Sequence, residues 1–158
     1  MGVVLEEREV AAELARRRAG GERIVLTNGV FNLLHVGHLR YLRQARALGD
    51  VLVVGVNSDA SASALKPGRP LVPEAERAEL VAALDPVGYA VVFADRTADR
   101  LIASLRPAVY AKGGDYSEAT LPEMATARAV GARVAFLPLV TDRSTTALLK
   151  SMQGPPQD

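Results

Sequence analysis

The chain has 158 residues, of which 49% are hydrophobic and 23% charged, and its formal net charge is +1. This composition is that of one soluble domain with a sizeable core, and the charge balance gives no basis for binding nucleic acid or a membrane surface. The chain contains no cysteine, which excludes disulfides, thiol chemistry and cysteine-ligated metals. No apolar run approaches the ~20 residues that cross a bilayer, and no signal-peptide core is present, so we expect a cytoplasmic protein.

Three segments are expected along the chain. A polar helix over Glu6–Arg18 should stop at the glycine pair Gly20-Gly21, because glycine ends helices readily. We therefore assign residues 1–21 to an N-terminal helix, residues 22–152 to the main domain and residues 153–158 to a frayed tail.

Strands and helices alternate through the main domain. Apolar runs predict strands at 24–26, 51–56, 87–93, 108–111 and 133–137. Periodic segments predict helices at 39–48, 73–84, 97–106, 122–130 and 144–152, with Pro73 opening the second and Thr97 capping the third. Strands joined by single helices favour a Rossmann-like, doubly wound α/β fold, with a five-stranded parallel sheet in the order 3-2-1-4-5 and helices on both faces.

Two glycine-containing segments should meet at the centre of this sheet. Ligands of such sheets bind beyond the carboxyl ends of the strands, where the strand order reverses, and here strands one and four border that point. The segment from Thr27 to His38 follows strand one, and Lys112-Gly113-Gly114-Asp115 follows strand four. We therefore expect both segments to line one crevice.

Both histidines of the chain fall in His35-Val36-Gly37-His38, between a strand and a helix N-terminus. Free N–H groups and the helix dipole attract anions there, and Gly37 permits close approach. Paired imidazoles can hydrogen-bond phosphate oxygens and, when protonated, offset negative charge. A pair of surface or core histidines and a metal site are the alternatives, but no third ligand lies near in sequence. The pattern favours a phosphate site.

A long polar loop runs from Asn57 to Leu71. Loops of this length in a compact domain often have a function. We interpret it as a mobile flap that delivers Lys66 and Arg69 to phosphates, and a solvated loop with routine charges is the alternative.

Arg77 should lie on the inward face of its helix, together with Leu80, Val81 and Leu84. An inward arginine needs an anionic partner. That partner is either an internal carboxylate, in a salt bridge, or a phosphate or ribose at the edge of the crevice.

Ser144-Thr145-Thr146 begins the last expected helix. Simple N-capping explains Ser144. Consecutive hydroxyls with free N–H groups also suit the end of a triphosphate, and the neighbouring Arg143 favours that second interpretation.

At this point the motifs resemble a known family. Thr27-Asn28-Gly29-Val30-Phe31 followed by the His35–His38 turn looks like the nucleotidyltransferase superfamily marked by His-x-Gly-His, and within it the D-glycero-β-D-manno-heptose 1-phosphate adenylyltransferase (ADP-heptose synthase) group. The supporting segments occur in the family's order across residues 22–152: Val56-Asn57-Ser58-Asp59, Gly68-Arg69-Pro70, Glu76-Arg77-Ala78-Glu79-Leu80, Lys112-Gly113-Gly114-Asp115-Tyr116 and Ser144-Thr145-Thr146. Singly they are weak, but together they are specific.

The resemblance implies transfer of AMP from ATP to heptose 1-phosphate, giving an ADP-sugar for lipopolysaccharide precursors and releasing pyrophosphate. It implies Mg²⁺ held mainly by the nucleotide phosphates, with no metal ligand from the protein. The expected partners are a nucleoside triphosphate, a sugar phosphate, a second copy of the chain in a homodimer and a separate kinase earlier in the pathway. No nucleic acid and no membrane is expected among them.

The family pattern also assigns residue roles. The catalytic residues would be His35, His38 and Lys66. The nucleotide-binding residues would be Thr27, Asn28, Gly29, Val30, Phe31, Gly37, Arg77, Lys112, Gly113, Gly114, Asp115, Ser144, Thr145 and Thr146. The residues that bind the acceptor substrate would be Asn32, Asn57, Asp59 and Arg69.

One position departs from the family. The family usually carries Phe-Asp before the Leu-Leu-His turn, whereas this chain has Phe31-Asn32. If the carboxylate only orders the turn, the asparagine oxygen can replace it. If it contacts substrate or metal, the acceptor or the efficiency differs. A cytidylyltransferase for glycerol 3-phosphate or another small alcohol phosphate is the first alternative function, because the superfamily motif is shared. A nucleotide-binding regulatory module without turnover is the second, and Asn32 leaves it open.

Overall fold

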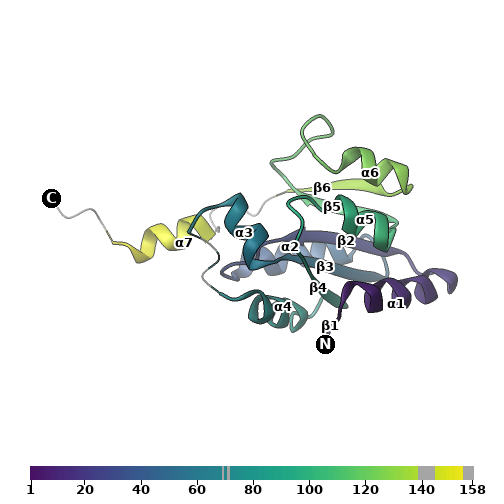
Figure 1. The fold of residues 1–158 in the computed structure, drawn as a ribbon, viewed down its shortest axis with the longest axis horizontal. Coiled ribbons are helices and arrows are strands. Elements are labelled where there is room, and N and C mark those ends of the chain that lie inside the picture. Colours follow the sequence, from purple (N-terminus) through teal and green to yellow (C-terminus); the bar gives the residue numbers. More distant parts are fainter. Residues whose placement is uncertain (69, 71, 139–144, 155–158) are drawn as a thin grey trace.

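A computed structural model describes residues 1–68, 70, 72–138 and 145–154 of the chain. One six-stranded sheet with parallel pairs forms the centre, in the order β1-β4-β3-β2-β5-β6. The strands are β1 (Val3–Val4), β2 (Ile24–Gly29), β3 (Val51–Asn57), β4 (Tyr89–Phe93), β5 (Val109–Gly113) and β6 (Arg133–Leu137). The helices are α1 (Glu7–Ala19), α2 (Val36–Arg46), α3 (Asp59–Leu65), α4 (Glu74–Ala82), α5 (Asp99–Leu105), α6 (Met124–Ala129) and α7 (Thr145–Met152), as Figure 1 shows.

The predicted order 3-2-1-4-5 is confirmed for β2 to β6, but the sheet has one strand more than expected. The extra strand β1 pairs with β4 at the sheet edge through Val3 and Val4. Both valines are exposed, at 51% and 42%. Two residues are too few for a period-2 pattern, so only the tertiary pairing reveals this strand.

Helices cover both faces of the sheet, as a doubly wound fold requires. Helices α1, α5 and α6 pack on one face, and α2 and α4 on the other. Alternate residues along each central strand supply the two cores: Leu26 and Val53 face the first group, while Val25 and Leu52 face the second. This alternation explains why the central strands are continuously apolar.

Two expectations about helix starts are wrong. Helix α5 begins at Asp99 with Ala98 as its N-cap, and no side chain caps it. Thr97 instead donates from its hydroxyl to Asp99 Oδ2, at 2.6 Å. Helix α6 begins at Met124, two residues after the Pro122 expected to open it. In both cases the buried carboxylate of Glu123 takes part, because its Oε1 accepts from the Ala98 N–H while Glu123 itself is the N-cap of α6.

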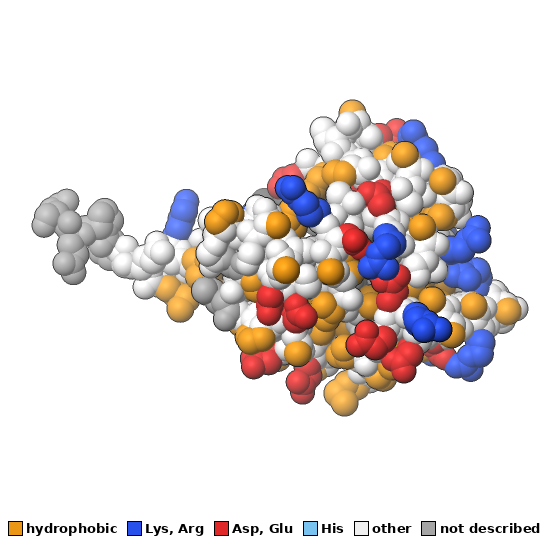
Figure 2. Space-filling view, viewed as in Figure 1, with side chains coloured by type: hydrophobic (Ala, Val, Ile, Leu, Met, Phe, Trp, Pro, Cys, Tyr) orange, Lys and Arg blue, Asp and Glu red, His pale blue; other side chains and the backbone are white. Residues whose placement is uncertain are grey.

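The surface carries no large patch of one charge on the face shown in Figure 2, where acidic and basic side chains are interspersed over α1 and α5. Acidic side chains gather over α4, which contains Glu74, Glu76 and Glu79. Among the described residues, no helix has the length and apolar content that crossing a membrane would need.

Candidate functional site

The pairing of β2 with β5 ends before the carboxyl ends of the two strands, where the sequence predicts the crevice. The two strands pair at Val25 with Val109 and at Leu26 with Tyr110. Beyond these pairs β2 continues to Gly29 and β5 to Gly113, with no further register partners between them. Their carboxyl ends therefore splay apart at the point where the strand order reverses, which is the usual ligand position in such sheets.

Tyr41 of α2 bridges the base of this opening. Its hydroxyl lies 2.7 Å from Thr27 Oγ1 and 3.2 Å from the Ala111 carbonyl oxygen, to which it donates. Burial raises the pKa of Tyr41 to about 12, so the phenol keeps its proton. Thr27 is fully buried, and its side chain braces the two strands from within. The nucleotide contact that we expect of Thr27 stays a prediction.

The His35–His38 turn forms the start of α2, the same helix that carries Tyr41. His35 is the N-cap, and its Nδ1 accepts from the Gly37 N–H at 3.1 Å. His38 Nδ1 accepts from the His35 N–H at 3.3 Å. The two ring centroids are 4.0 Å apart. The turn thus brings both imidazoles side by side at a helix N-terminus, as the sequence predicts.

These bonds determine which nitrogen carries the proton. A ring nitrogen that accepts from the backbone is unprotonated, so the neutral tautomer of each imidazole has its hydrogen on Nε2. Burial, followed by repulsion from His35, lowers the pKa of His38 to about 4. His38 is therefore neutral near pH 7 and acts as a hydrogen-bond donor. Of the two roles that the sequence allows for the imidazoles, the lowered pKa favours hydrogen bonding from a neutral ring over charge compensation by a protonated one.

Phe31 and Gly29 shape the floor under His38. Phe31 has a φ of +52°, in the left-handed region that few non-glycine residues occupy. Its ring is buried, with its centroid 5.5 Å from that of the His38 imidazole. A Cβ on Gly29 would lie 3.1 Å from Phe31 Cε2, so a larger residue would press on this ring. Both positions, predicted as nucleotide-binding, shape the turn itself.

On the β5 side, Lys112 is the basic group nearest the crevice. Its Nζ lies 3.5 Å from Asn28 Oδ1 and 5.2 Å from the centroid of the Tyr116 ring. Tyr110 donates to the same Asn28 oxygen at 2.5 Å. Burial lowers the pKa of Lys112, and the charge of Glu123 partly opposes this. The structure thus brings the predicted Asn28 and Lys112 together, while Gly113 is half-buried and Gly114 and Asp115 lie on the exposed loop that follows.

Arg77 is a buried hub in the structure. Its side chain has no exposed surface. Nε donates to the Val72 carbonyl, Nη1 to the Val30 and Asn57 carbonyls, and Nη2 to Asp59 Oδ1, all at 2.7–2.8 Å. The sequence predicts either an internal carboxylate or a phosphate or ribose as the partner of Arg77. The structure shows an internal carboxylate, that of Asp59.

The neighbours of Arg77 on α4 differ from the prediction in one respect. Val81 is fully buried and Leu84, two residues beyond the end of α4, is half-buried as expected, but Leu80 is 52% exposed, so it does not share the inward face. Three residues along a helix turn the side chain by about 300°, which leaves Leu80 at the rim.

Two of the four predicted acceptor residues, Asn57 and Asp59, lie at the end of β3. Asn57 is buried and donates from Nδ2 to Ser61 Oγ, at 3.1 Å. The side chain of Asp59 is 49% exposed beside Arg77. Lys66 is the exposed C-cap of α3, a helix that takes up half of the loop expected here. Asn32 is buried at 5% exposure. Arg69 lies outside the described residues.

The C-terminal hydroxyl cluster is only partly described. Thr146 is exposed on α7, which Figure 1 shows beyond α3, at the far end of the molecule from α1. Ser144 and its neighbour Arg143 lie outside the described residues, and so does the side chain of Thr145. The prediction that this cluster caps the triphosphate remains a prediction.

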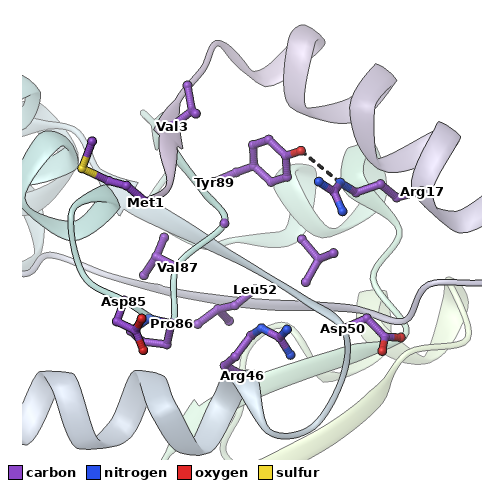
Figure 3. Close-up of a pocket in the computed structure, with 12 residues that line it drawn as sticks. Met1, Val3, Arg17, Arg46, Asp50, Leu52, Asp85, Pro86, Val87 and Tyr89 are labelled. Atoms are coloured by element: carbon purple, nitrogen blue, oxygen red, sulfur yellow. Dashed lines mark hydrogen bonds between the residues drawn. The ribbon is translucent and has the colours of Figure 1, made fainter.

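A separate hollow of about 360 Å³ lies at the opposite end of the sheet, at the amino ends of β3 and β4. Figure 3 shows Tyr89 pointing toward Arg17 across it, with Arg46 and Asp50 on the other side. Both arginines are already engaged, Arg17 with Tyr89 and Glu22 and Arg46 with the Gly49 carbonyl. This hollow is remote from the His35–His38 turn and plays no part in the site.

Comparisons with known proteins agree with this geometry. The model of the cytidylyltransferase-like family matches residues 26–145, from the middle of β2 to the start of α7. The chain belongs to this family. The matched region contains the His35–His38 turn, Arg77 and the β5 segment, so the crevice lies entirely within the family's domain.

Individual relatives carry more specific names. The chain is 50% identical over 139 residues to the bifunctional protein HldE of Syntrophotalea carbinolica, covering 87% of this chain and 28% of that protein. It is 48% identical over 141 residues to HldE of Geobacter metallireducens, covering 89% of this chain and 29% of that protein. The chain thus spans about three tenths of the length of these relatives.

A solved structure shares the fold. The lipopolysaccharide core biosynthesis protein of Thermoplasma volcanium superposes with a TM-score of 0.63 at 29% identity, covering 76% of this chain and 98% of that one.

Sequence reasoning missed several residues that build the site. Tyr41 lies three positions after His38 on the same helix, so its polar tip on the inward face was a usable signal. Tyr110 lies in the apolar strand β5, where the sequence pattern does not distinguish it from the core residues beside it. Glu123 gave no signal at all, because nothing local distinguishes a buried helix-capping carboxylate from a solvated one.

Proposed function

We propose that the chain is a nucleotidyltransferase that transfers AMP from ATP to a sugar 1-phosphate, with heptose 1-phosphate as acceptor, and releases pyrophosphate. The observation that carries the proposal is the pair of imidazoles at the N-terminus of α2, each with Nδ1 occupied by a backbone N–H. Two Nε2–H donors at a helix N-terminus suit a polyphosphate. The choice of ATP and heptose 1-phosphate rests on the likeness to the HldE proteins.

The proposed reaction is an in-line displacement at the α-phosphorus. An oxygen of the acceptor phosphate forms a bond to that phosphorus, and the bond to the bridging oxygen breaks, so its electron pair leaves with pyrophosphate. A phosphate monoester is largely ionised at pH 7, since its second pKa is about 6, and the attacking oxygen therefore needs no general base. Catalysis must come from positioning and charge stabilisation.

The residues of the crevice supply these two effects. His38 donates from a neutral ring to an oxygen on which charge develops, with His35 beside it. Because His38 is partly buried, its hydrogen bond acts in a medium of lower dielectric constant, where it is stronger than in water. Lys112 lies on the β5 side beside Asn28, and Lys66 would reach the phosphates from the end of α3, each adding a positive charge.

We propose that Mg²⁺ enters this site with the nucleotide, as an ion carried by the substrate. Among the described residues, no group of three His, Cys, Asp or Glu side chains could hold a metal. Phosphate oxygens and water are sufficient ligands for Mg²⁺, and the ion, when bound with ATP, neutralises part of the phosphate charge.

Further proposals concern the surroundings of the reaction. The sugar 1-phosphate must come from a sugar kinase, and we propose that a separate kinase supplies it. The chain acts in the cytoplasm, where ATP is available, and forms a homodimer. Light scattering at micromolar concentration tests the dimer directly, since a mass of one chain, 16.8 kDa, would contradict it.

The activity is tested by pyrophosphate release with purified chain and Mg²⁺. ATP and CTP are each combined with heptose 1-phosphate, another sugar 1-phosphate and glycerol 3-phosphate. We expect turnover with ATP and heptose 1-phosphate. Turnover with CTP and glycerol 3-phosphate alone would instead establish a cytidylyltransferase, and nucleotide binding without release in any combination would indicate a regulatory module.

A further inference from the structure

Arg77 is the largest side chain that is fully buried, and it is a cation. Four of its five N–H groups donate to the Val72, Val30 and Asn57 carbonyls and to Asp59 Oδ1. A phosphate could reach it only by displacing these bonds from inside the protein. Its partners, however, belong to segments that border the crevice on two sides, so its influence on the site does not require contact with a ligand.

The first connection runs to the His35–His38 turn. Nη1 donates to the Val30 carbonyl at 2.7 Å. The next residue, Phe31, occupies the left-handed region, and its ring lies against His38. Such a backbone conformation persists only where surrounding bonds hold it. The hydrogen bond from Arg77 to the Val30 carbonyl is one of those bonds. Arg77 therefore helps to hold the Phe31 ring in its position under His38.

The second connection runs to the segment that carries Lys66. Nη1 also donates to the Asn57 carbonyl at the end of β3, and Nη2 pairs with Asp59 in the first turn of α3. Glu74 strengthens the same point, because its Oε2 accepts from the Asp59 N–H at 2.6 Å. Nε holds Val72, just before α4. One side chain therefore fastens both ends of the stretch from Asp59 to Val72.

Arginine is the residue type that this junction requires. Its planar guanidinium directs donors along several fixed directions, whereas a lysine ammonium is a single point with three donors. Four acceptors, from the residue after β2, from the junction of β3 and α3 and from the residue before Pro73, match the first geometry and not the second.

We propose that Arg77 is a positioning residue that sets the His35–His38 turn and the Lys66 segment in one fixed relation, and that it acts on transfer without touching the nucleotide. The proposal rests on the proposed nucleotidyl transfer for its kinetic part. It replaces the expectation that Arg77 binds nucleotide phosphate.

The test compares Arg77→Lys with Arg17→Lys. Arg17 is a matched control because it also holds several partners, Tyr89 and Glu22 among them, but at the opposite end of the sheet. We expect Arg77→Lys to lower kcat by at least ~10-fold while the KM for ATP changes by less than ~3-fold, because the hydrogen bonds that lysine cannot make lie outside the nucleotide site. Arg17→Lys should leave both unchanged.

Hydrogen exchange supplies the readout that is independent of activity. In Arg77→Lys, amides of the 30–38 turn and of residues 58–66 should exchange faster together, while those of β6 keep their wild-type rates. Asp59→Asn serves as a milder second variant if Arg77→Lys does not fold, because it weakens one of the four bonds. It should speed exchange over 58–66 more than over the turn.

The outcomes are separable. A raised KM for ATP with unchanged kcat in Arg77→Lys would mean direct phosphate binding and overturn the proposal. Unchanged exchange in the 30–38 turn would overturn it as well. If the wild-type chain releases no pyrophosphate with any substrate, the proposed function fails, and the exchange measurements still decide whether Arg77 couples the two segments.

Discussion

His38 donates from a neutral ring because of its immediate neighbours. The His35 N–H occupies one ring nitrogen, the Phe31 ring lies 5.5 Å away, and a second imidazole lies 4.0 Å away. Burial of the His38 ring, followed by repulsion from His35, lowers the pKa of His38 to about 4. A donor that is already oriented and needs no ionisation loses little on moving to the transition state, which is the condition for electrostatic catalysis.

Replacement of His38 by alanine should therefore reduce turnover far more than nucleotide binding. Its hydrogen bond strengthens as charge develops on the phosphate oxygens, so its loss falls on the transition state. We expect kcat to fall at least ~10²-fold, by analogy with removal of an oxyanion donor. Steady-state pyrophosphate release and ATP binding by calorimetry check this, and near-normal turnover would exclude the role.

The substitution Asn32→Asp tests what the departure from the family at this position means. Asn32 is buried in the turn before α2, so Asn32→Asp places a carboxylate where water is scarce but the helix N-terminus is close. If this side chain only orders the turn, kinetics with each acceptor should stay within ~3-fold and the free energy of unfolding should change by less than about 1 kcal/mol. Acceptor profiling and Mg²⁺ titration of both proteins measure this. A large gain in turnover would instead indicate a direct role for the family carboxylate.

At the scale of elements, the site depends on where strands part and helices begin. β2 and β5 stop pairing at Leu26 and Tyr110, and Tyr41 spans the opening below the His35–His38 turn. On the other side, α3 occupies much of the stretch that the sequence suggested was a flap, which leaves Lys66 at its end. Leu65, Lys66, Pro67 and Gly68 are all exposed. The expected flap is therefore shorter than predicted, and its motion remains a prediction.

Triphosphate should protect this segment. If Lys66 reaches the phosphates, ATP with Mg²⁺ should slow cleavage near Lys66 by proteinase K and slow amide exchange at Lys66 and Gly68. Trypsin is unsuitable, because both Lys66 and Arg69 precede proline. The control is Lys66→Ala, in which the ligand should protect less. Equal cleavage with and without ATP in the wild-type chain would count against a flap.

At the scale of the whole molecule, the pKa of His38 links stability to pH. The folded state holds the His38 proton less tightly than the unfolded chain, with a pKa of about 4 against 6.5. Between these values the unfolded chain binds more protons, so the free energy of unfolding falls as pH decreases through this window. The contribution is fully present above pH 6.5.

Thermal melting at pH 7 and pH 4.5 measures this link. The wild-type chain should lose more stability between the two pH values than His38→Gln, in which the titrating group is gone. Carboxylates titrate in both proteins, so their effects cancel in the comparison. Equal losses in the two proteins would show that His38 is not as enclosed as the structure indicates.

Much of this molecule follows from patterns that the sequence carries locally. Continuous apolar runs determine the strands from β2 to β6, the helices between successive strands determine their parallel order, and the His35–His38 turn follows from its position between a strand and a helix. These features are local because each depends on residues a few positions apart. The family resemblance rests on the same short motifs.

Only the tertiary structure decided what the inward polar groups do. The sequence left Arg77 with either a phosphate or an internal carboxylate, and the structure shows its bonds to Val30, Asn57 and Asp59, which are 18 to 47 positions away. The pairing of β1 with β4 and the hydrogen bond from the Ala98 N–H to Glu123 are also long-range. A buried polar group takes whichever partners packing brings within hydrogen-bond distance, and no local pattern records that choice.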